Sequence, residues 1–201
     1  MSEVSRLLKK AARGDGEAFI ALVSPCEKQV YAVCLRMMQS PADAADVMQD
    51  TMLRAFRALP DYKPTGSLCG WLCRIAANLC LDRLRSKSRH PEDSMEQLQE
   101  DTGFDIADAG TPYEALEEKE RKAVLEQALA RLPDEDRALL LQRAAAGLSY
   151  EELADSLELP VGTVKSRLNR AREKLKKILW PDRELFADQS VSFMEGGKKD
   201  E

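Results

Sequence analysis

The chain has 201 residues and a net charge of −5, with 44% hydrophobic and 5% aromatic residues. This composition can bury one large core or two small ones, and few aromatics beside abundant Ala, Leu, Glu and Arg favour packed helices over a β-sandwich. No apolar run approaches the roughly 20 residues that span a bilayer, and the N-terminus lacks the apolar stretch of a secretory signal, so we expect a cytoplasmic protein.

The first 90 residues predict a helical domain. Asp15 is a suitable N-cap for its first helix, which Pro25 should kink or interrupt. The second helix is expected from Pro41 to Leu59, and the third from Leu68 to Ser88 after a loop. Helical spacing assigns to the core Phe19, Leu22, Val23, Val30, Tyr31 and Leu35 in the first helix, Ala44, Met48, Met52, Ala55 and Leu59 in the second, and Leu68, Leu72, Ile75 and Leu79 in the third.

Three of the five cysteines, Cys69, Cys73 and Cys80, share one stripe of the third helix. A thiolate metal or redox site is one interpretation. Zinc sites normally have four ligands, however, and the only histidine is His90, with no fourth cysteine nearby in the sequence. Cysteine is also a common buried residue, so a core stripe is the favoured interpretation, with reduced thiols as is usual in the cytoplasm.

An acidic segment separates this domain from a second one. Between His90 and Glu120 there are eleven acidic residues and a single basic one, Lys119. Residues 91–112 lack periodicity and are interpreted as a flexible linker. Helical periodicity returns from Tyr113 to Leu132 and from Asp134 to Ala146, and Gly147 should end the latter helix. The second domain is therefore placed at 113–181, with a weakly ordered tail at 182–201.

A helix-turn-helix is predicted within the second domain. Ser149 and Glu152 form a capping box at the start of a short helix that ends at Leu157. A tight turn at 158–162 follows, and then a helix over 163–179. Glu158 stands where such turns usually have glycine; in the left-handed region it would cost about 1 kcal/mol.

The second helix of this motif has an apolar side and a basic side. At 100° per residue the apolar side is formed by Val164, Leu168, Ala171, Leu175 and Leu179. Residues 163–177 hold seven bases against one acid, Glu173. The polar side suits the major groove, where central residues can read base edges and flanking cations hold phosphates. The alternative, a solvated basic face of a helical bundle, is disfavoured by the adjoining capping box and turn.

Two blocks of the sequence resemble the extracytoplasmic-function (ECF) family of bacterial sigma factors. Residues 147–154 (GLSYEELA) and 160–168 (PVGTVKSRL) resemble region 4.2 of that family. Residues 70–79 (GWLCRIAANL) and 82–85 (DRLR) resemble regions 2.3 and 2.4, although Leu68-Cys69-Gly70 replaces a more aromatic pattern. Asp43, Asp46, Gln49 and Asp50 resemble region 2.2. The resemblance covers about residues 10–180.

The resemblance implies a sigma factor that directs RNA polymerase core to promoters. The first domain would then melt the −10 element and the second would bind the −35 duplex. Implied partners are the clamp helices of the largest polymerase subunit, the flap region of the second-largest subunit, promoter DNA, and an anti-sigma factor that can be membrane-tethered. The acidic linker would occupy the RNA path of the enzyme, or serve as a mere tether.

The resemblance also assigns site residues. Contacts with the −35 element are assigned to Thr163, Lys165, Ser166, Arg167, Asn169, Arg170, Arg172 and Lys174. The −10 strand is assigned to Tyr62, Lys63, Ser67, Arg74, Asn78 and Arg85. Binding of core polymerase is assigned to Asp43, Asp46, Gln49, Asp50 and Leu53. Helical spacing puts the last four on one exposed face, which without the resemblance would be interpreted as an ordinary solvated face.

Two other classes of protein stay open. A DNA-binding response regulator or repressor with a helical sensor domain would share the second domain but bind DNA without polymerase. A helical adaptor that binds only proteins would show no salt-sensitive affinity for DNA. The sequence shows no Ser/His/Asp set, phosphate loop or paired carboxylate site, so we expect neither an enzyme nor a bound cofactor or metal.

Overall fold

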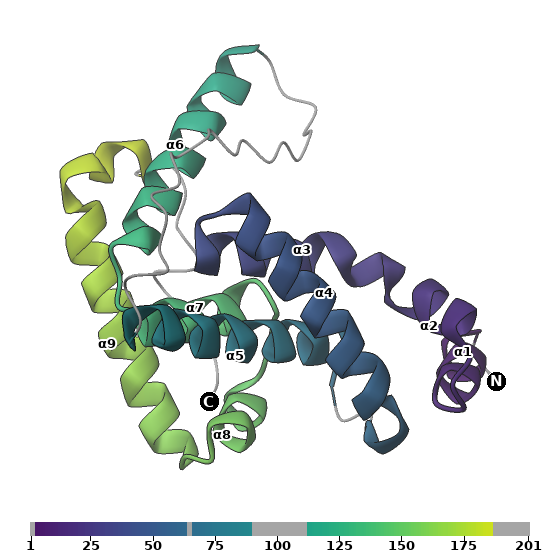
Figure 1. Ribbon diagram of the computed structural model, residues 1–201. Coiled ribbons are helices and arrows are strands. Elements are labelled where there is room, and N and C mark those ends of the chain that lie inside the picture. Colours follow the sequence, from purple (N-terminus) through teal and green to yellow (C-terminus); the bar gives the residue numbers. More distant parts are fainter. Residues whose placement is uncertain (1–2, 64–65, 90–111, 187–201) are drawn as a thin grey trace.

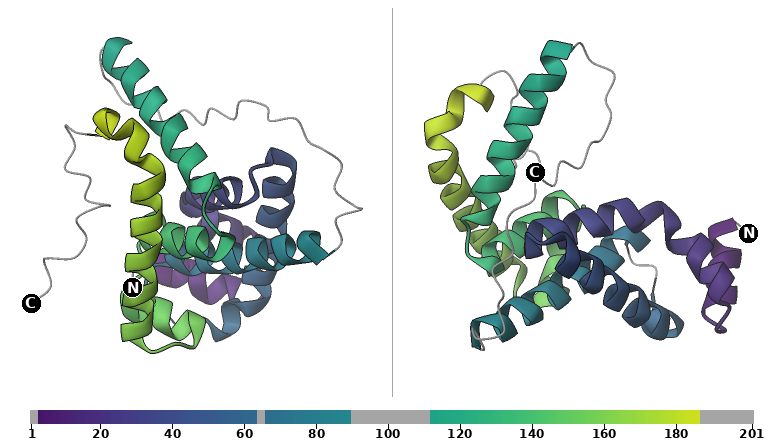
Figure 2. Two further views of the ribbon diagram at one scale, coloured as in Figure 1. Left: turned by 90° about the vertical axis from the view of Figure 1, so that its left-hand side faces the viewer. Right: turned by 45° about the horizontal axis from the view of Figure 1, so that its top comes forward.

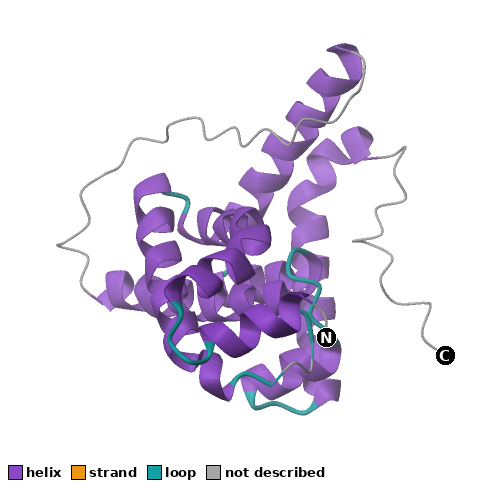
Figure 3. Ribbon diagram, turned by 90° about the vertical axis from the view of Figure 1, so that its right-hand side faces the viewer, coloured by secondary structure: helices purple, strands orange, loops and turns teal. Residues whose placement is uncertain are grey.

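The computed structural model describes residues 3–63, 66–89 and 112–186, without the side chains of 112–117. The regular elements among these residues are helical (Figure 3), which confirms the all-α class. Most of the expected linker and most of the expected tail lie outside the described residues. The domain boundaries stay a prediction, and we call residues 3–89 the first unit and residues 112–186 the second unit.

The first unit consists of the helices α1 to α5. Their bounds are α1 (Glu3–Ala11), α2 (Gly16–Val23), α3 (Glu27–Met38), α4 (Pro41–Ala58) and α5 (Leu68–Arg89), with the 3-10 turns η1 (Ser24–Cys26) and η2 (Leu59–Asp61). α3 packs against α4 and α5, which also contact each other. α1 and α2 pack together at the N-terminal end of the molecule (Figure 1).

Local sequence signals explain where these helices begin. The Asp15 carboxylate accepts a hydrogen bond from the Ala18 N–H at 3.0 Å, as predicted for the start of α2. Pro25 lies in η1, so the predicted kink or interruption is a break between α2 and α3. α1 is an element that the sequence reasoning missed, although Leu7, Leu8 and Ala11 recur at helical spacing.

The second unit consists of the helices α6 to α9. Their bounds are α6 (Pro112–Ala130), α7 (Asp134–Ala144), α8 (Tyr150–Leu157) and α9 (Val161–Leu179), followed by the 3-10 segment η4 (Trp180–Phe186). α9 contacts α6, α7 and α8 and so organises this unit (Figure 2). η4 extends into the segment that was expected to be a weakly ordered tail.

α7 ends in the turn that leads to the helix-turn-helix. Gly147 has a φ of 68°, the left-handed conformation expected after a helix C-terminus. The Leu148 N–H donates to the Gln142 carbonyl at 3.2 Å, which satisfies one of the last carbonyls of α7. We call residues 145–149 the docking turn, because they lie against the first unit.

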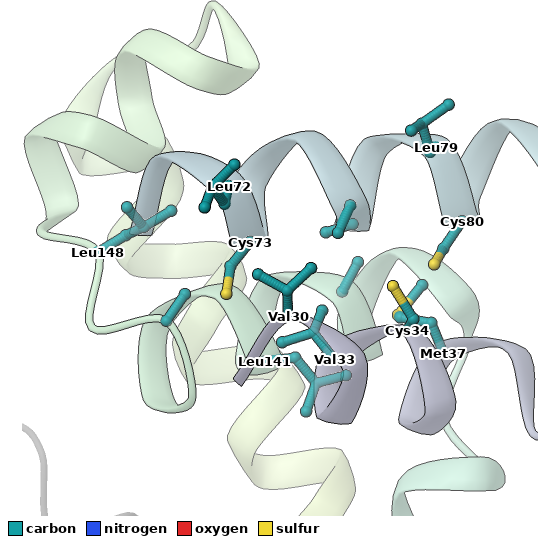
Figure 4. Packing of buried hydrophobic residues seen from close by; sticks show 14 of the residues in the cluster. Val30, Val33, Cys34, Met37, Leu72, Cys73, Leu79, Cys80, Leu141 and Leu148 are labelled. Atoms are coloured by element: carbon teal, nitrogen blue, oxygen red, sulfur yellow. The ribbon is translucent and has the colours of Figure 1, made fainter. Parts of the chain in front are cut away.

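The hydrophobic core is continuous across the two units. Val30 and Val33 of α3 and Leu72 of α5 belong to the same buried cluster as Leu141 of α7 and Leu148 of the docking turn (Figure 4). α7 contacts both α3 and α5, and α6 contacts α3. This shared core was not predicted, since helical periodicity identifies a buried face and not its partner.

The predicted core positions of the first unit all lie in the core or pack against it. Tyr31, Leu35, Met48, Met52, Leu68 and Ile75 are only partly buried, whereas the other predicted core residues of the first unit are buried. Several smaller residues that were not named as core positions are completely or almost completely buried: Val47 and Thr51 in α4, and Cys73, Ala76, Ala77 and Cys80 in α5. Small side chains let neighbouring helices approach closely, and a pattern search for large apolar residues passes over them.

The cysteines follow the core interpretation only in part. Cys73 and Cys80 are buried, and burial raises the pKa of Cys73 to about 12. The prediction is wrong for Cys69, whose sulfur is bonded to that of Cys26. The two Cα atoms are 5.1 Å apart although the residues are 43 positions apart in the sequence, so cysteine spacing gave no sign of the pair.

One stretch of helix is long and apolar enough to cross a membrane. It runs from Gly16 to Met38 with a mean hydropathy of 1.3, so the expectation that no such run exists was too strict. η1 interrupts it, and many of its apolar side chains, among them Leu22, Val30 and Val33, are buried in the core, although Ile20 is 62% exposed. A buried core segment accounts for this composition.

Arg137 is a buried charge where the two units meet. Its side chain is only 4% exposed, and Nη2 donates to the Met37 carbonyl at 3.0 Å and to the Asp134 carboxylate at 2.6 Å. Nη1 donates to the Ala130 carbonyl at 3.2 Å. Burial lowers the pKa of Arg137, and Asp134 opposes that shift. Because Met37 lies in the last turn of α3, the cation also interacts favourably with the negative end of that helix.

Candidate functional site

α9 has the apolar and basic sides that its sequence predicts. The predicted apolar positions are all buried: Val164, Leu168, Ala171, Leu175 and Leu179. The residues assigned to the −35 element are exposed at Lys165, Ser166, Arg167, Asn169, Arg170 and Lys174, and partly buried at Thr163 and Arg172. The predicted orientation of the helix is confirmed, while its contacts with DNA stay a prediction.

The capping box and the tight turn set the position of α9. The Ser149 hydroxyl accepts a hydrogen bond from the Glu152 N–H at 3.0 Å, and the Glu152 carboxylate accepts one from the Ser149 N–H at 2.7 Å. Glu158 ends α8 with a φ of 53°, so it does adopt the left-handed conformation usually given to glycine. The turn keeps its shape with glutamate at a cost of about 1 kcal/mol.

Hydrogen bonds along α9 order the centre of its polar face. The Arg170 Nε donates to the Ser166 carbonyl at 3.3 Å, and the Ser166 hydroxyl donates to the Thr163 carbonyl at 2.9 Å. These bonds hold a guanidinium and a hydroxyl on the side of the helix opposite Leu168. Side chains that are already ordered before binding lose less conformational entropy when they bind a base edge.

Two cations at the edges of this face are engaged within the second unit. The Lys165 ammonium lies 5.2 Å from the centre of the Tyr150 ring, a cation–π contact. Lys174, 53% exposed, forms an ion pair with Asp136 of α7 at 2.5 Å. Lys174 must exchange this carboxylate for a phosphate if it is to bind DNA.

The residues assigned to the −10 strand fall into two groups. Tyr62, Ser67 and Arg74 gather at the start of α5, where the Ser67 hydroxyl accepts the Gly70 N–H at 2.9 Å; Lys63 is exposed in the loop before it. Arg85 lies about 16 Å beyond Arg74 along the helix axis, at 1.5 Å per residue. Asn78 is exposed between them. The helix therefore places these polar groups along one stripe and not in one pocket.

Trp71 is a residue that the predicted set omits. Its ring lies 4.7 Å from that of Tyr62, measured between centroids, with the planes inclined at 46°. Unstacked bases pack against aromatic rings in single-strand binding proteins. Trp71 lies only a few residues after the loop assigned to the −10 strand. Its aromatic side chain at that position could have identified it as a further candidate from the sequence.

The second unit covers part of this surface. Arg85 forms an ion pair with Glu135 at 2.9 Å. The Glu152 carboxylate lies against Gly66, where a Cβ would overlap it. Burial raises the pKa of Tyr62, and the negative charge of Glu152 raises it further while Arg74 lowers it. In this arrangement Arg85 and the loop that follows Tyr62 lie against the second unit, whereas Lys63 and Asn78 stay exposed.

The face of α4 assigned to core polymerase is mostly open. Asp46, Gln49, Asp50 and Leu53 are exposed, and Leu53 is 56% exposed despite being apolar. Asp43 differs from them in burial: its side chain is 20% exposed and pairs with Lys87 of α5 at 2.7 Å, whereas Asp46, which pairs with Arg83 of α5 at 3.6 Å, is 64% exposed. The structure therefore groups four of the five assigned residues, with Asp43 turned toward α5. Among the described residues no cluster of His, Cys, Asp and Glu is arranged to hold a metal ion.

Two family models match the chain. The model for sigma-70 region 2 matches residues 22–90, a range that ends one residue after the first unit. The model for sigma-70 region 4 matches residues 122–175, within the second unit. The gap between the two matches contains the acidic segment.

Similar proteins align with most of the chain. RNA polymerase sigma-H factor of Pseudomonas aeruginosa is 33% identical over 180 residues, which cover 88% of this chain and 93% of that protein. ECF RNA polymerase sigma factor SigW of Bacillus subtilis is 30% identical and covers 88% and 96%. Among solved structures, CnrH in complex with the cytosolic domain of CnrY superposes with a TM-score of 0.60 at 28% identity, covering 88% of this chain and 96% of that one. RpoE of Bartonella quintana, in complex with the anti-sigma factor NepR, superposes with a TM-score of 0.63 at 25% identity, covering 82% and 98%.

Proposed function

Because this chain belongs to the ECF sigma factors of the sigma-70 family and directs promoter-specific transcription initiation, we propose that its two units divide promoter recognition between them. The first unit captures the melted −10 strand and docks on the clamp helices of polymerase. The second unit binds the −35 duplex and the flap region. The activity lies in binding, with no catalysis by the chain itself, and it takes place in the cytoplasm with the polymerase.

The polar face of α9 is the observation that supports −35 recognition most directly. Its apolar seam is completely buried, so the helix has one side left with which to meet DNA. Ser166, Asn169 and Arg170 lie near the centre of that side and are proposed to read base edges, as is Lys165. Arg167, Arg172 and Lys174 lie toward its edges and are proposed to bind phosphates.

The first unit supports −10 capture through aromatic and cationic groups at the start of α5. The Tyr62 and Trp71 rings can stack on unpaired bases, while Arg74 and, further along, Arg85 can neutralise the strand's phosphates. The open face of α4 presents Asp46, Asp50 and the exposed Leu53 to a basic and apolar surface of polymerase.

An anti-sigma factor is the further partner that we propose. Both similar solved structures are complexes: CnrH with the cytosolic domain of CnrY, and RpoE with the anti-sigma factor NepR. A partner of this class would hold the present chain away from polymerase until a signal releases it.

Run-off transcription with purified polymerase core tests the proposed function. The full chain should give promoter-dependent transcripts that core alone does not give. A repressor would bind the same DNA without polymerase and start no transcript, and an adaptor would bind no DNA, so either result would replace the proposal.

Matched variants of α9 test the division between base reading and phosphate binding. Arg170→Ala should weaken binding to the preferred −35 sequence by about 1–3 kcal/mol and relax the preference at one position. Lys174→Ala should weaken all sequences alike and lower the salt dependence by about one phosphate contact. Asp136→Ala is the control for Lys174, because it frees that cation and should strengthen binding to all sequences. A changed sequence preference with Lys174→Ala and none with Arg170→Ala would reverse the assignment.

A further inference from the structure

Cys26 and Cys69 join two elements of the first unit that begin side by side. Cys26 is the last residue of η1, directly before α3, and Cys69 lies in the first turn of α5. Their Cα atoms are 5.1 Å apart, which lies inside the range that a disulfide bridges without movement of the backbone, and the sulfurs are bonded.

The same two elements hold the docking turn of the second unit. Gln29, one helical turn after Cys26, donates a side-chain hydrogen bond to the Ala145 carbonyl. Gly70, next to Cys69, is buried beneath the turn: a Cβ there would lie 3.0 Å from Leu148 Cδ2 and 3.2 Å from the Ala146 carbonyl oxygen. The bond between Cys26 and Cys69 therefore fixes the spacing of the two supports on which the docking turn lies.

The surroundings of the two sulfurs suit reversible oxidation. Cys69 is partly exposed at the N-terminus of a 22-residue helix, where the helix dipole stabilises a thiolate. Cys26 is only 2% exposed and adjoins it, so it can resolve an oxidised Cys69. The three other cysteines, Cys34, Cys73 and Cys80, are buried and unbonded, and they provide an internal comparison.

We propose that Cys26 and Cys69 are a reversible redox site, at which oxidation by hydrogen peroxide stabilises docking of the second unit and lowers promoter binding. The Cys69 thiolate attacks a peroxide oxygen, which forms Cys69 sulfenic acid and releases water once the leaving oxygen has taken a proton. The Cys26 sulfur then displaces the sulfenic oxygen as a second water. Two thiols lose two electrons and two hydrogens, and one peroxide bond is reduced. A dithiol reductant reverses the reaction through a mixed disulfide.

Docking opposes promoter binding because it occupies residues of the −10 surface. In the docked arrangement Arg85 is paired with Glu135, and Glu152 lies against Gly66 in the loop after Tyr62. When the docked arrangement predominates, a bond that stabilises it weakens strand binding by the same factor, since the two states compete. This consequence for DNA rests on the proposed function, whereas the redox chemistry and the docking do not.

The test uses the full chain, reduced or treated with hydrogen peroxide and then freed of it. Intact mass should fall by two hydrogens, and alkylation of the treated protein after unfolding in urea should spare Cys26 and Cys69 alone, because unfolding exposes the three buried thiols. Hydrogen exchange of peptides covering residues 140–150 should slow at least about fivefold on oxidation, the lower end of typical coupling between sites. Promoter binding with polymerase core should weaken by a similar factor and recover with dithiothreitol.

Serine variants and a matched control decide the outcome. Cys69→Ser and Cys26→Ser should abolish every response to peroxide and match the reduced wild type in promoter binding. Cys73→Ala, one turn along α5 from Cys69, should keep the full response. No bond after peroxide, unchanged exchange at 140–150, or unchanged promoter binding by an active protein would overturn the proposal. A reduced protein that never forms a promoter complex would refute the proposed function instead, because mass and exchange are measured without polymerase.

Discussion

Replacing Arg137 by alanine should loosen the contact between the two units and destabilise the second. Arg137 is 4% exposed and donates to the backbone carbonyls of Met37 in the first unit and Ala130 in the second. Truncation leaves both carbonyls without their charged donor. A hydrogen bond to a charged group contributes about 1.5–3 kcal/mol, so the two together are worth about 3–6 kcal/mol.

Burial of the guanidinium offsets part of this contribution. Its Nε atom is buried without a hydrogen-bond partner, and desolvation of a cation is unfavourable. We therefore expect Arg137→Ala to lower the free energy of unfolding by about 3 kcal/mol, which is roughly a hundredfold change in the equilibrium constant. Urea unfolding of the full chain, followed by circular dichroism, should show the midpoint fall by about 1.5 M at a slope near 2 kcal/mol per M.

Asp134→Ala separates the carbonyl contacts from the ion pair. The Asp134 side chain is 47% exposed, so loss of its pair with Arg137 should lower stability by less than about 1 kcal/mol. If both variants destabilise the protein equally, the ion pair and not the carbonyl contacts stabilises this region. If Arg137→Ala lowers stability by less than about 0.5 kcal/mol, desolvation cancels the hydrogen bonds and the reasoning above is refuted.

Three more outcomes are expected from single features of the structure. Asp46→Arg combined with Asp50→Arg should abolish co-purification with polymerase core without changing the helical signal, and retained binding would exclude this face as the docking surface. Glu158→Gly should raise the melting temperature slightly, because relief of about 1 kcal/mol at φ 53° exceeds the added entropy of the unfolded chain; a lower melting temperature would mean that the turn is unstrained. In reduced protein the pKa of Cys73 is raised to about 12 from an ordinary value of 9.0, so stability should be full below pH 9 and fall above it by about 1.4 kcal/mol per pH unit until pH 12. Urea unfolding at pH 8 and 10.5 measures that loss of stability. Cys73→Ala should reduce the loss. If the wild type loses no stability between the two pH values, the Cys73 thiol is solvated and this prediction is wrong.

The helix-turn-helix could be predicted closely because its signals are local. The capping box formed by Ser149 and Glu152 is present with both hydrogen bonds, and Glu158 adopts the left-handed conformation that its position required. The buried seam of α9, represented by Leu168, follows from a period of 3.6 residues alone. Each of these features depends on residues within one or two helical turns of one another.

Contacts between distant segments could not be predicted in this way. The bond between Cys26 and Cys69 and the hydrogen bond from Arg137 to Met37 join residues that are 43 and 100 positions apart. Periodicity shows that α7 and α5 each have a buried side, but it does not say that Leu141 and Leu72 lie in one core. The −10 assignment has the same limit, since sequence placed Arg85 on α5 without showing that Glu135 pairs with it.

The contacts between the units also bear on how quickly the protein can change shape. Gln29 and Arg137 bind backbone carbonyls of the opposite unit, and Arg85 and Glu135 pair between exposed side chains. None of these bonds completes a helix, and the Ser149 N–H keeps its Glu152 cap whether or not the units touch. Separation of the units would therefore break no hydrogen bond within a helix, while it would expose side chains of the shared core such as Leu72 and Leu141. Domain motions of this kind take microseconds to milliseconds, so opening should be fast enough to follow by relaxation-dispersion NMR.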